Sequence, residues 1–368
     1  MKFAFVGIFL VIEAIIALGH YFVYATIMRL TGIPLSAQMS LRVGFGIMAF
    51  SFVIVSSFAM KYYGPWLRPF YQVAAFWLGT MHWLIIAAVL CWLLYAVTRL
   101  IGLQLNFSPI ASAVLALGLV VSIYGLWNSY QTQVRSINVR LEGLPEQWRG
   151  RRAVFLADTH IGNMRSSAFA EKITKLINEQ QPDVVLITGD LYDGTVDDYR
   201  SVSAPFGKIQ SRFGTYFATG NHEEFRDSEP LIAPLRSAGI NVLTNRAEDV
   251  DGLQIAGINY RDGRSAEAQA KILADMKLDR QRASILIKHV PDKLETARDA
   301  GIDLQVSGHT HSGQMWPFNL ITQKIFGSFF YGLNSLDSLQ VYTTSGVGTW
   351  GPPQRVGTNP EIVVATFE

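Results

Sequence analysis

Hydrophobic residues follow two different patterns along the chain, one before about residue 130 and one after it. In the first part, charge-free stretches run for 18, 30 and 35 residues within the intervals 42–61, 68–99 and 99–135. A helix needs about 20 mostly apolar residues to cross the hydrocarbon core of a bilayer. The pattern therefore predicts four membrane-spanning helices, over residues 4–27, 42–60, 74–98 and 108–128.

The charge distribution supports this division. Residues 1–130 contain six Lys or Arg and a single acid, Glu13, whereas residues 131–368 contain 25 basic and 28 acidic side chains. The four apolar segments lack the polar face that a helix of a soluble core would carry. Tyr62, Trp66, Trp127 and Tyr130 flank them, as is typical of rings at the level of lipid headgroups. The small net charge of +2 indicates no nucleic-acid partner.

The basic residues near the spans predict the orientation. An even number of spans places both termini on one side, and loops rich in Lys and Arg tend to stay in the cytoplasm. If the amino terminus is cytoplasmic, five basic residues near the spans are cytoplasmic as well: Lys2, Lys61, Arg68, Arg135 and Arg140. Three then lie outside: Arg29, Arg42 and Arg99. We therefore expect an inner (cytoplasmic) membrane protein whose carboxyl-terminal domain is cytoplasmic. The one cysteine, Cys91, lies within a span and does not report the redox compartment.

From residue 131 onward, short apolar runs alternate with amphipathic stretches. Five runs have the composition of buried strands: 152–158, 182–190, 214–222, 283–289 and 302–309. Four stretches have helical period: 166–180, 228–239, 265–277 and 292–301. A hairpin over 240–260 and closing strands over 340–345 and 361–368 complete the pattern. Strands that alternate with helices predict an α/β layered domain over residues 131–368.

Each of the five predicted strands ends in residues that can bind a metal. These residues are Asp158 and His160, Asp190, Asn221 and His222, His289, and His309 and His311. Five of the seven histidines in the chain occupy such positions. Because the carboxyl ends of strands meet at the edge of a sheet where ligands bind, we expect these side chains to converge.

The types of donor indicate the kind of metal centre. Carboxylates, imidazoles and a carboxamide, with no thiolate, suit Mn²⁺, Fe or Zn²⁺. Seven candidate ligands are too many for one ion: Asp158, His160, Asp190, Asn221, His289, His309 and His311. Two ions about 3.5–4 Å apart that share a carboxylate would use them all.

The same residues carry a family resemblance. DTH (158–160), GDLYD (189–193), GNHE (220–223), the lone His289 and GHTH (308–311) resemble the five ordered motifs of the calcineurin-like metallophosphoesterases. One such motif is weak evidence, but five in order are specific. The resemblance covers residues 150–368 and implies an α/β/β/α domain. The apolar amino terminus and the segment SGVGTWGPPQRVG (345–357) resemble the membrane-anchored bacterial branch, which includes enzymes that hydrolyse UDP-2,3-diacylglucosamine in lipid A biosynthesis.

The resemblance also implies residue roles. Asp158, His160 and His311 would hold one divalent ion, Asn221, His289 and His309 the other, and Asp190 would bridge them. A water between the ions would lose a proton near neutral pH and attack phosphorus. His222 would stabilise the developing charge or protonate the leaving group, and Glu223 would orient its imidazole.

Several other residues keep two interpretations. Asp193 is either a solvated turn carboxylate or a partner of a metal ligand. Arg355 either meets a substrate phosphate or forms a surface ion pair. Lys288 adjoins a proposed ligand, but alternation along a strand turns it to the opposite face. Trp316 and Trp350 either contact substrate or are buried in the core.

The leading functional hypothesis is a membrane-anchored, two-metal phosphodiesterase or pyrophosphatase acting on a lipid-linked phosphoester. The inference to a lipid depends on the anchor, which raises the local concentration of membrane-embedded molecules. One alternative is a phosphoesterase of soluble nucleotides or phosphoproteins, which would use the same metal chemistry. Another is a non-catalytic metal-binding sensor coupled to the membrane.

Overall fold

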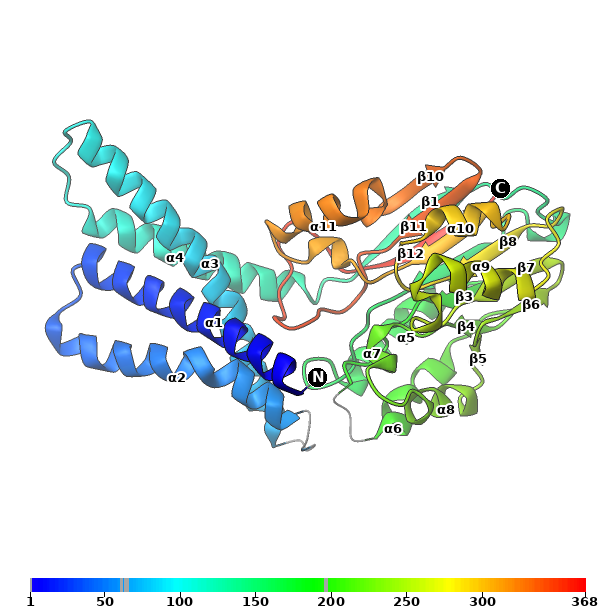
Figure 1. Ribbon diagram of the computed structural model, residues 1–368, viewed down its shortest axis with the longest axis horizontal. Coiled ribbons are helices and arrows are strands. Elements are labelled where there is room, and N and C mark those ends of the chain that lie inside the picture. Colours follow the sequence, from blue (N-terminus) through cyan, green and yellow to red (C-terminus); the bar gives the residue numbers. More distant parts are fainter. Residues whose placement is uncertain (1, 60–61, 63–65, 195–197) are drawn as a thin grey trace. The chain divides into compact units, whose positions relative to one another are not determined.

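The computed structural model describes residues 2–59, 62, 66–194 and 198–368 (Figure 1). It divides into two compact units, which we describe separately: Met1–Trp127 with Gly351–Gln354, and Asn128–Trp350 with Arg355–Glu368. Lys61, one of the residues used to predict the orientation, lies outside the described residues.

The first unit is built from four long helices. They are α1 (Lys2–Leu30), α2 (Leu35–Ala59), α3 (Leu67–Leu100) and α4 (Ser108–Asn128). Each contains a segment long and apolar enough to cross a membrane, which confirms that the four predicted segments are long apolar helices. Polar side chains inside the unit pair with one another, as Trp77 does when its indole N–H donates to His20 Nε2 at 2.9 Å. Gln354 also belongs to this unit and accepts a hydrogen bond from the Trp83 indole at 3.1 Å.

The second unit contains two six-stranded mixed sheets. The first has the order β1 (Gln133–Val139), β12 (Glu361–Phe367), β2 (Arg152–Leu156), β3 (Val184–Ile187), β4 (Thr215–Phe217) and β5 (Asn241–Val242). The second has the order β10 (Gly332–Leu336), β11 (Leu339–Thr343), β9 (Leu304–Ser307), β8 (Ser284–Ile287), β7 (Leu253–Gly257) and β6 (Arg246–Val250). Strands β2, β3 and β4 are mutually parallel, as are β7, β8, β9 and β11. The predicted hairpin is the antiparallel pair β6 and β7.

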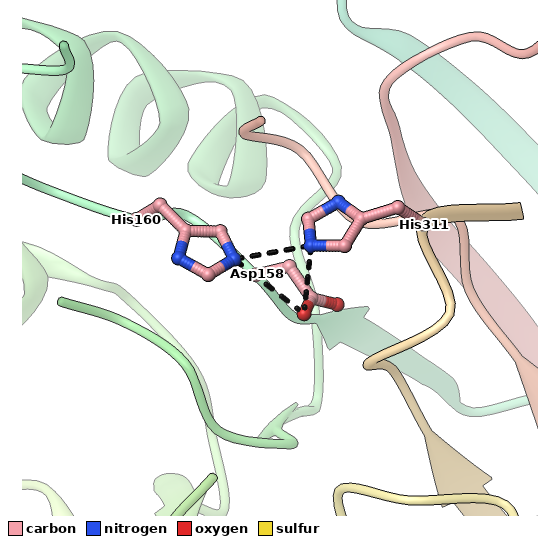
Figure 2. Close-up of side chains that lie close together, drawn as sticks. All are labelled: Asp158, His160 and His311. Atoms are coloured by element: carbon pink, nitrogen blue, oxygen red, sulfur yellow. Dashed lines mark hydrogen bonds and ion pairs between the residues drawn. The ribbon is translucent and has the colours of Figure 1, made fainter. Parts of the chain in front are cut away.

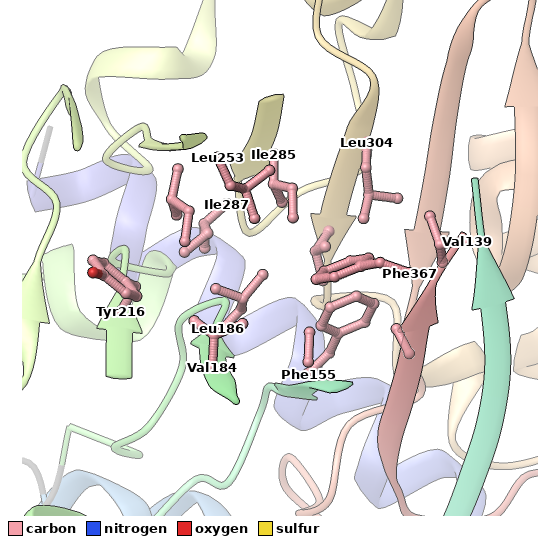
Figure 3. Packing of buried hydrophobic residues seen from close by; sticks show 14 of the residues in the cluster. Val139, Phe155, Val184, Leu186, Tyr216, Leu253, Ile285, Ile287, Leu304 and Phe367 are labelled. Carbon is pink, nitrogen blue, oxygen red and sulfur yellow. The ribbon is translucent and has the colours of Figure 1, made fainter. Parts of the chain in front are cut away.

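Side-chain alternation along the strands produces the layers. On β2, Phe155 joins the apolar core between the sheets, whereas Val154 and Leu156 join a second core on the outer face. On β8, Ile285 and Ile287 join the inner core (Figure 3). Complete burial of such a side chain contributes roughly 1.5–3 kcal/mol to stability.

Helices cover the outer faces of both sheets. The first outer core includes α5 (Ser167–Glu179) and α8 (Glu229–Ser237), and the second includes α9 (Ala266–Asp275) and α10 (Leu294–Asp299). This arrangement confirms the α/β/β/α fold. The sequence patterns did not predict β1, β10 or the helices α6 (Tyr199–Ser203), α7 (Asn221–Glu224) and α11 (Phe318–Phe326).

Candidate metal centre

The loops that follow β2, β3 and β9 bend sharply as soon as each strand ends. Five of the proposed ligands adopt a left-handed backbone, with φ between +47° and +71°: Asp158, His160, Asp190, His309 and His311. Such conformations cost about 1–3 kcal/mol each and cluster at functional sites, where the surrounding structure holds them in place. The bends turn the side chains of strand-end residues towards one another.

Three glycines allow the backbone to pack against the two central carboxylates. A Cβ atom on Gly220 would overlap Asp190, and one on Gly308 or Gly346 would overlap Asp158. These close approaches explain why glycine precedes the ligands in the GNHE and GHTH motifs.

The first cluster of ligand atoms joins β2 to the loop after β9 (Figure 2). His160 Nε2 and His311 Nε2 lie 3.1 Å apart, and Asp158 Oδ1 lies 3.8 Å and 3.5 Å from them. Ligands about 2.0–2.2 Å from one ion lie roughly 3–3.5 Å from each other. The three atoms are therefore spaced as ligands of a shared cation would be.

The second cluster contains Asp190, His289 and His309, whose ligand atoms lie within 4.8 Å of one another. His289 Nε2 lies 3.1 Å from Asp190 Oδ2 and 4.0 Å from Asp158 Oδ1, so the two clusters are adjacent. His289 Nδ1 lies 2.6 Å from the Thr188 carbonyl, which can only accept. Nδ1 therefore carries a proton, and Nε2 is the ring nitrogen that faces the cluster.

Asn221 opens the short helix α7 beside these residues. Its buried Oδ1 atom has no hydrogen-bond partner among the described residues, and neither has His289 Nε2. An unpaired buried acceptor costs about 1–3 kcal/mol. A bound cation would satisfy both atoms, so the donor set fits a metal site.

Burial and neighbouring charges perturb the pKa values of the acidic residues. Burial, together with the neighbouring Asp190, raises the pKa of Asp158 to about 6 against the opposing effect of His289. Burial alone would also raise the pKa of Asp190, but His289 and His222 lower it well below its usual range. Asp190 is therefore ionised throughout the neutral and mildly acidic range, whereas Asp158 gains a proton at mildly acidic pH.

Most of the imidazoles are neutral. Burial, reinforced by neighbouring histidines, lowers the pKa of His222 and of His309 to about 4 and that of His311 well below its usual range. His160 and His289 differ, because neighbouring carboxylates outweigh their burial. Asp193 and Asp190 raise the pKa of His160, and Asp190 and Asp158 raise the pKa of His289 to about 9. Neutral imidazoles are the form that binds metals.

His222 and Asp193 lie beside the first cluster. Asp193 Oδ1 is 3.5 Å from His222 Nδ1 and 3.7 Å from His160 Nδ1. His222 Nε2 is 4.0 Å from Asp190 Oδ2, and its ring centre is 4.6 Å from that of His160. Of the two interpretations of Asp193, the structure favours the partner of a metal ligand over a solvated turn carboxylate.

Glu223 lies in a different environment from the one expected. Its carboxylate accepts hydrogen bonds from the backbone N–H groups of Gly220, Asp190 and Tyr192, at 2.8, 2.9 and 3.2 Å. It therefore holds the GDLYD and GNHE loops together instead of orienting the His222 imidazole.

Arg355 and Lys288 have structural surroundings. Arg355 is fully buried and its Nη2 donates to the carbonyls of Ser345 and Gly348 at 2.6 and 2.7 Å, which fits neither a phosphate clamp nor a surface ion pair. The same Nη2 lies 3.3 Å from His311 Nδ1, so Arg355 supports a proposed ligand. Lys288 Nζ donates to the carbonyls of Val290 and Asp292. This is a structural role, as expected for a side chain on the face of the strand opposite the proposed ligand.

The two tryptophans of uncertain role are exposed, Trp316 by 48% and Trp350 by 61%. Core burial is therefore wrong for both. The Trp350 backbone is held by the side chain of Gln314, through hydrogen bonds of 2.9 and 3.0 Å.

Residues 151–313 match the model of the calcineurin-like phosphoesterases, which is the stretch that contains all five motifs. An uncharacterized metallophosphoesterase of Campylobacter jejuni, Cj0846, is 32% identical over 259 residues, which is 68% of either chain. The chain belongs to the metallophosphoesterase family. A transmembrane protein with a metallophosphoesterase domain from Danio rerio is 34% identical over 264 residues, or 66% of this chain and 59% of that protein.

The general activity follows from membership of this family, together with the four apolar helices and the clustered His and Asp side chains. The chain is a metal-dependent phosphoester hydrolase with transmembrane helices, and its ligand clusters are compatible with a dinuclear centre. A 5'-nucleotidase precursor from Thermus thermophilus aligns over 58% of this chain and 54% of its own, at 16% identity and a TM-score of 0.37.

Proposed function

We propose that this metallophosphoesterase uses two divalent ions to hydrolyse a phosphodiester or pyrophosphate bond of a lipid-linked substrate such as UDP-2,3-diacylglucosamine. Residues 1–130 form the anchor, and residues 131–368 form the hydrolase domain. The observation that carries the proposal is the adjacency of two ligand clusters, in which His289 Nε2 lies within 4.0 Å of both Asp158 and Asp190.

The proposal gives each ligand a place. Asp158, His160 and His311 would hold one ion, Asn221, His289 and His309 would hold the other, and the Asp190 carboxylate would be shared by both. When bound, two divalent ions supply Lewis-acid charge and an activated water. Mn²⁺, Fe and Zn²⁺ all suit these oxygen and nitrogen donors.

His222 acts on the phosphoryl group in this proposal. With its pKa at about 4 it is neutral at pH 7, so it retains one ring N–H with which to stabilise developing negative charge. Asp193, 3.5 Å from Nδ1, orients the ring. Glu223 and Arg355 position the loops and do not touch the substrate.

The anchor supports a lipid-linked substrate, because four spanning helices keep the hydrolase domain near the bilayer and raise the local concentration of lipids. The excess of basic residues at the inner ends of the spans supports an inner membrane location with a cytoplasmic catalytic domain. Soluble nucleotides and phosphoproteins remain the alternative substrates, because the metal chemistry is the same for all three.

Hydrolysis of bis-p-nitrophenyl phosphate in detergent with Mn²⁺ tests the mechanism. The wild-type protein should hydrolyse this substrate, and both Asp190→Asn and His222→Ala should lose most of the activity. Metal-dependent turnover that survives Asp190→Asn would contradict the proposed centre. A wild-type protein that binds metal but is inactive on every phosphoester tried would support the sensor alternative.

The substrate class needs a separate experiment. The purified protein is incubated with a total lipid extract, and mass spectrometry identifies the phospholipids that disappear, with Asp190→Asn as the control. Metal-dependent loss of a lipid pyrophosphate supports the proposal. Loss of nucleotides alone from a mixed extract would identify a soluble substrate instead.

A further inference from the structure

Helix α11 exposes most of its apolar side chains. It begins seven residues after the proposed ligand His311, and none of its residues is buried. The exposed fractions are 55% for Leu320, 55% for Ile321 and 68% for Ile325. Contiguous exposed apolar surface of this kind marks an interaction site, because a soluble surface rarely leaves it in water.

The spacing along α11 separates an outward side from an inward side. Asn319, Thr322 and Phe326 are half-buried and recur at intervals of three and four residues, so they face the domain. Leu320, Ile321 and Lys324 lie on the opposite side and are exposed. Lys324 lies among the apolar residues of this outward side, and its long flexible stem would let the ammonium group reach the headgroups while its neighbours enter the membrane interface.

Charge around α11 fits a lipid surface. From residue 304 to residue 336, Lys324 is the only Lys, Arg, Asp or Glu. No acidic side chain in this stretch opposes anionic headgroups. Trp316, 48% exposed just before the helix, is of the residue type enriched at headgroup level.

The helix is attached to the metal centre at both ends. The chain enters it directly from the GHTH turn, and after it the Thr310 hydroxyl donates to the Phe330 carbonyl at 2.7 Å. The Phe326 ring centre lies 6.3 Å from that of His309. A surface that captures α11 therefore also captures the turn that supplies two proposed ligands.

We propose that α11 lies in the interface of the lipid bilayer, with Leu320, Ile321 and Ile325 among the acyl chains and Lys324 at the headgroups. The four spanning helices keep the domain at the membrane, so a short helix suffices to fix its approach. The proposal depends on the membrane anchor and is independent of the substrate, because a soluble phosphoester could also reach a centre docked in this way.

The test places an environment-sensitive fluorophore on α11 in nanodiscs of anionic phospholipid. Cys91 is replaced by Ala, and single cysteines are introduced by Ile321→Cys or, as the matched control on the exposed end of α8, by Ser237→Cys. Lipids with a shallow nitroxide should quench the probe at 321 several-fold more than the probe at 237, with a blue-shifted emission. Circular dichroism and monodisperse elution confirm that both labelled proteins are folded.

Other outcomes contradict the proposal. Equal, weak quenching at both positions would show that α11 stays in water. A blue-shifted probe at 321 that lipid nitroxides do not quench would show that protein covers the helix, and crosslinking between copies would then identify a dimer interface. Neither outcome depends on activity, so failure of the proposed hydrolysis and failure of membrane docking are separately visible.

Discussion

His160 and His311 bring their Nε2 atoms to 3.1 Å, although 151 positions separate them in the chain. Both nitrogens face the same Asp158 oxygen, at 3.8 and 3.5 Å. Two ring nitrogens this close repel each other unless a proton or a cation lies between them. A cation would also compensate the charge of the buried carboxylate. The fold therefore brings the first and last motifs of the domain together in a cluster that could hold a metal ion.

Removing one histidine from GHTH should remove one ion and leave the other. We expect His311→Ala and His309→Ala each to lower the bound metal from about two equivalents to about one, because the two imidazoles belong to different ligand sets. Turnover should fall by about 100-fold or more, since the lost charge no longer stabilises the transition state. Elemental analysis of the purified variants measures the stoichiometry. Loss of both ions from either variant would show that the pair serves a single ion.

Asp190→Asn should have the larger effect, because in the proposed centre this carboxylate is shared by both ions. We expect both ions to bind more weakly and turnover to fall more than in either histidine variant. Isothermal titration with Mn²⁺ compares the affinities. A matched substitution, Asp337→Asn, removes a largely exposed carboxylate that pairs with Arg298 and should leave metal binding unchanged. Equal affinities in wild type and Asp190→Asn would exclude the bridging role.

The strand ends could be predicted from the sequence because they depend on local pattern. Runs such as 182–190 are apolar and end in a polar residue, and alternation along each strand requires no distant partner. The local pattern did not predict which strands belong to which sheet: β2, β3 and β4 lie in one, and β8 and β9 lie in the other. The loops nevertheless converge, because the two sheets pack face to face on a shared core.

The contacts of Arg355 and Glu223 could not be predicted, because both depend on loops that only the folded chain brings together. A buried guanidinium needs several acceptors, and here they are backbone carbonyls of residues 345–348. Helix α11 was missed because its apolar residues are exposed and do not follow a single buried stripe. Strand β1 was missed because most of its residues, QVRSINV, are exposed and polar.

Chelation of the metals should destabilise the second unit. Removal of the cations leaves the Asp158 and Asp190 carboxylates and the Asn221 oxygen buried without a positive charge to compensate them. A ligand present at 100 times its dissociation constant stabilises the folded state by about 2.7 kcal/mol, so dialysis against chelator should lower the unfolding temperature by several degrees. Added Mn²⁺ should restore it in the wild type but not in Asp190→Asn. An unfolding temperature insensitive to chelator would mean that the centre is empty in the purified protein.

Glu223→Gln should destabilise the protein without removing a ligand. The carboxylate accepts three backbone N–H groups, and a carboxamide would turn an NH₂ group towards at least one of them. We expect a loss of about 1–3 kcal/mol in the free energy of unfolding, measured by chemical denaturation. Glu171→Gln, at an exposed position of α5, is the control and should have no measurable effect. Metal affinity should also fall in Glu223→Gln, because the Asp190 backbone loses its hydrogen bond.

Arg355→Lys separates a supporting role from a phosphate-binding role. An ammonium group cannot reproduce the planar fork that reaches the carbonyls of Ser345, Gly346 and Gly348, so buried acceptors are left unpaired. We expect a loss of about 2–4 kcal/mol of stability and weaker metal binding through His311. KM for a soluble phosphodiester should change less than kcat, because Arg355 is fully buried and supports the centre from behind. A large rise in KM at unchanged stability and metal content would instead place the guanidinium on the substrate phosphate.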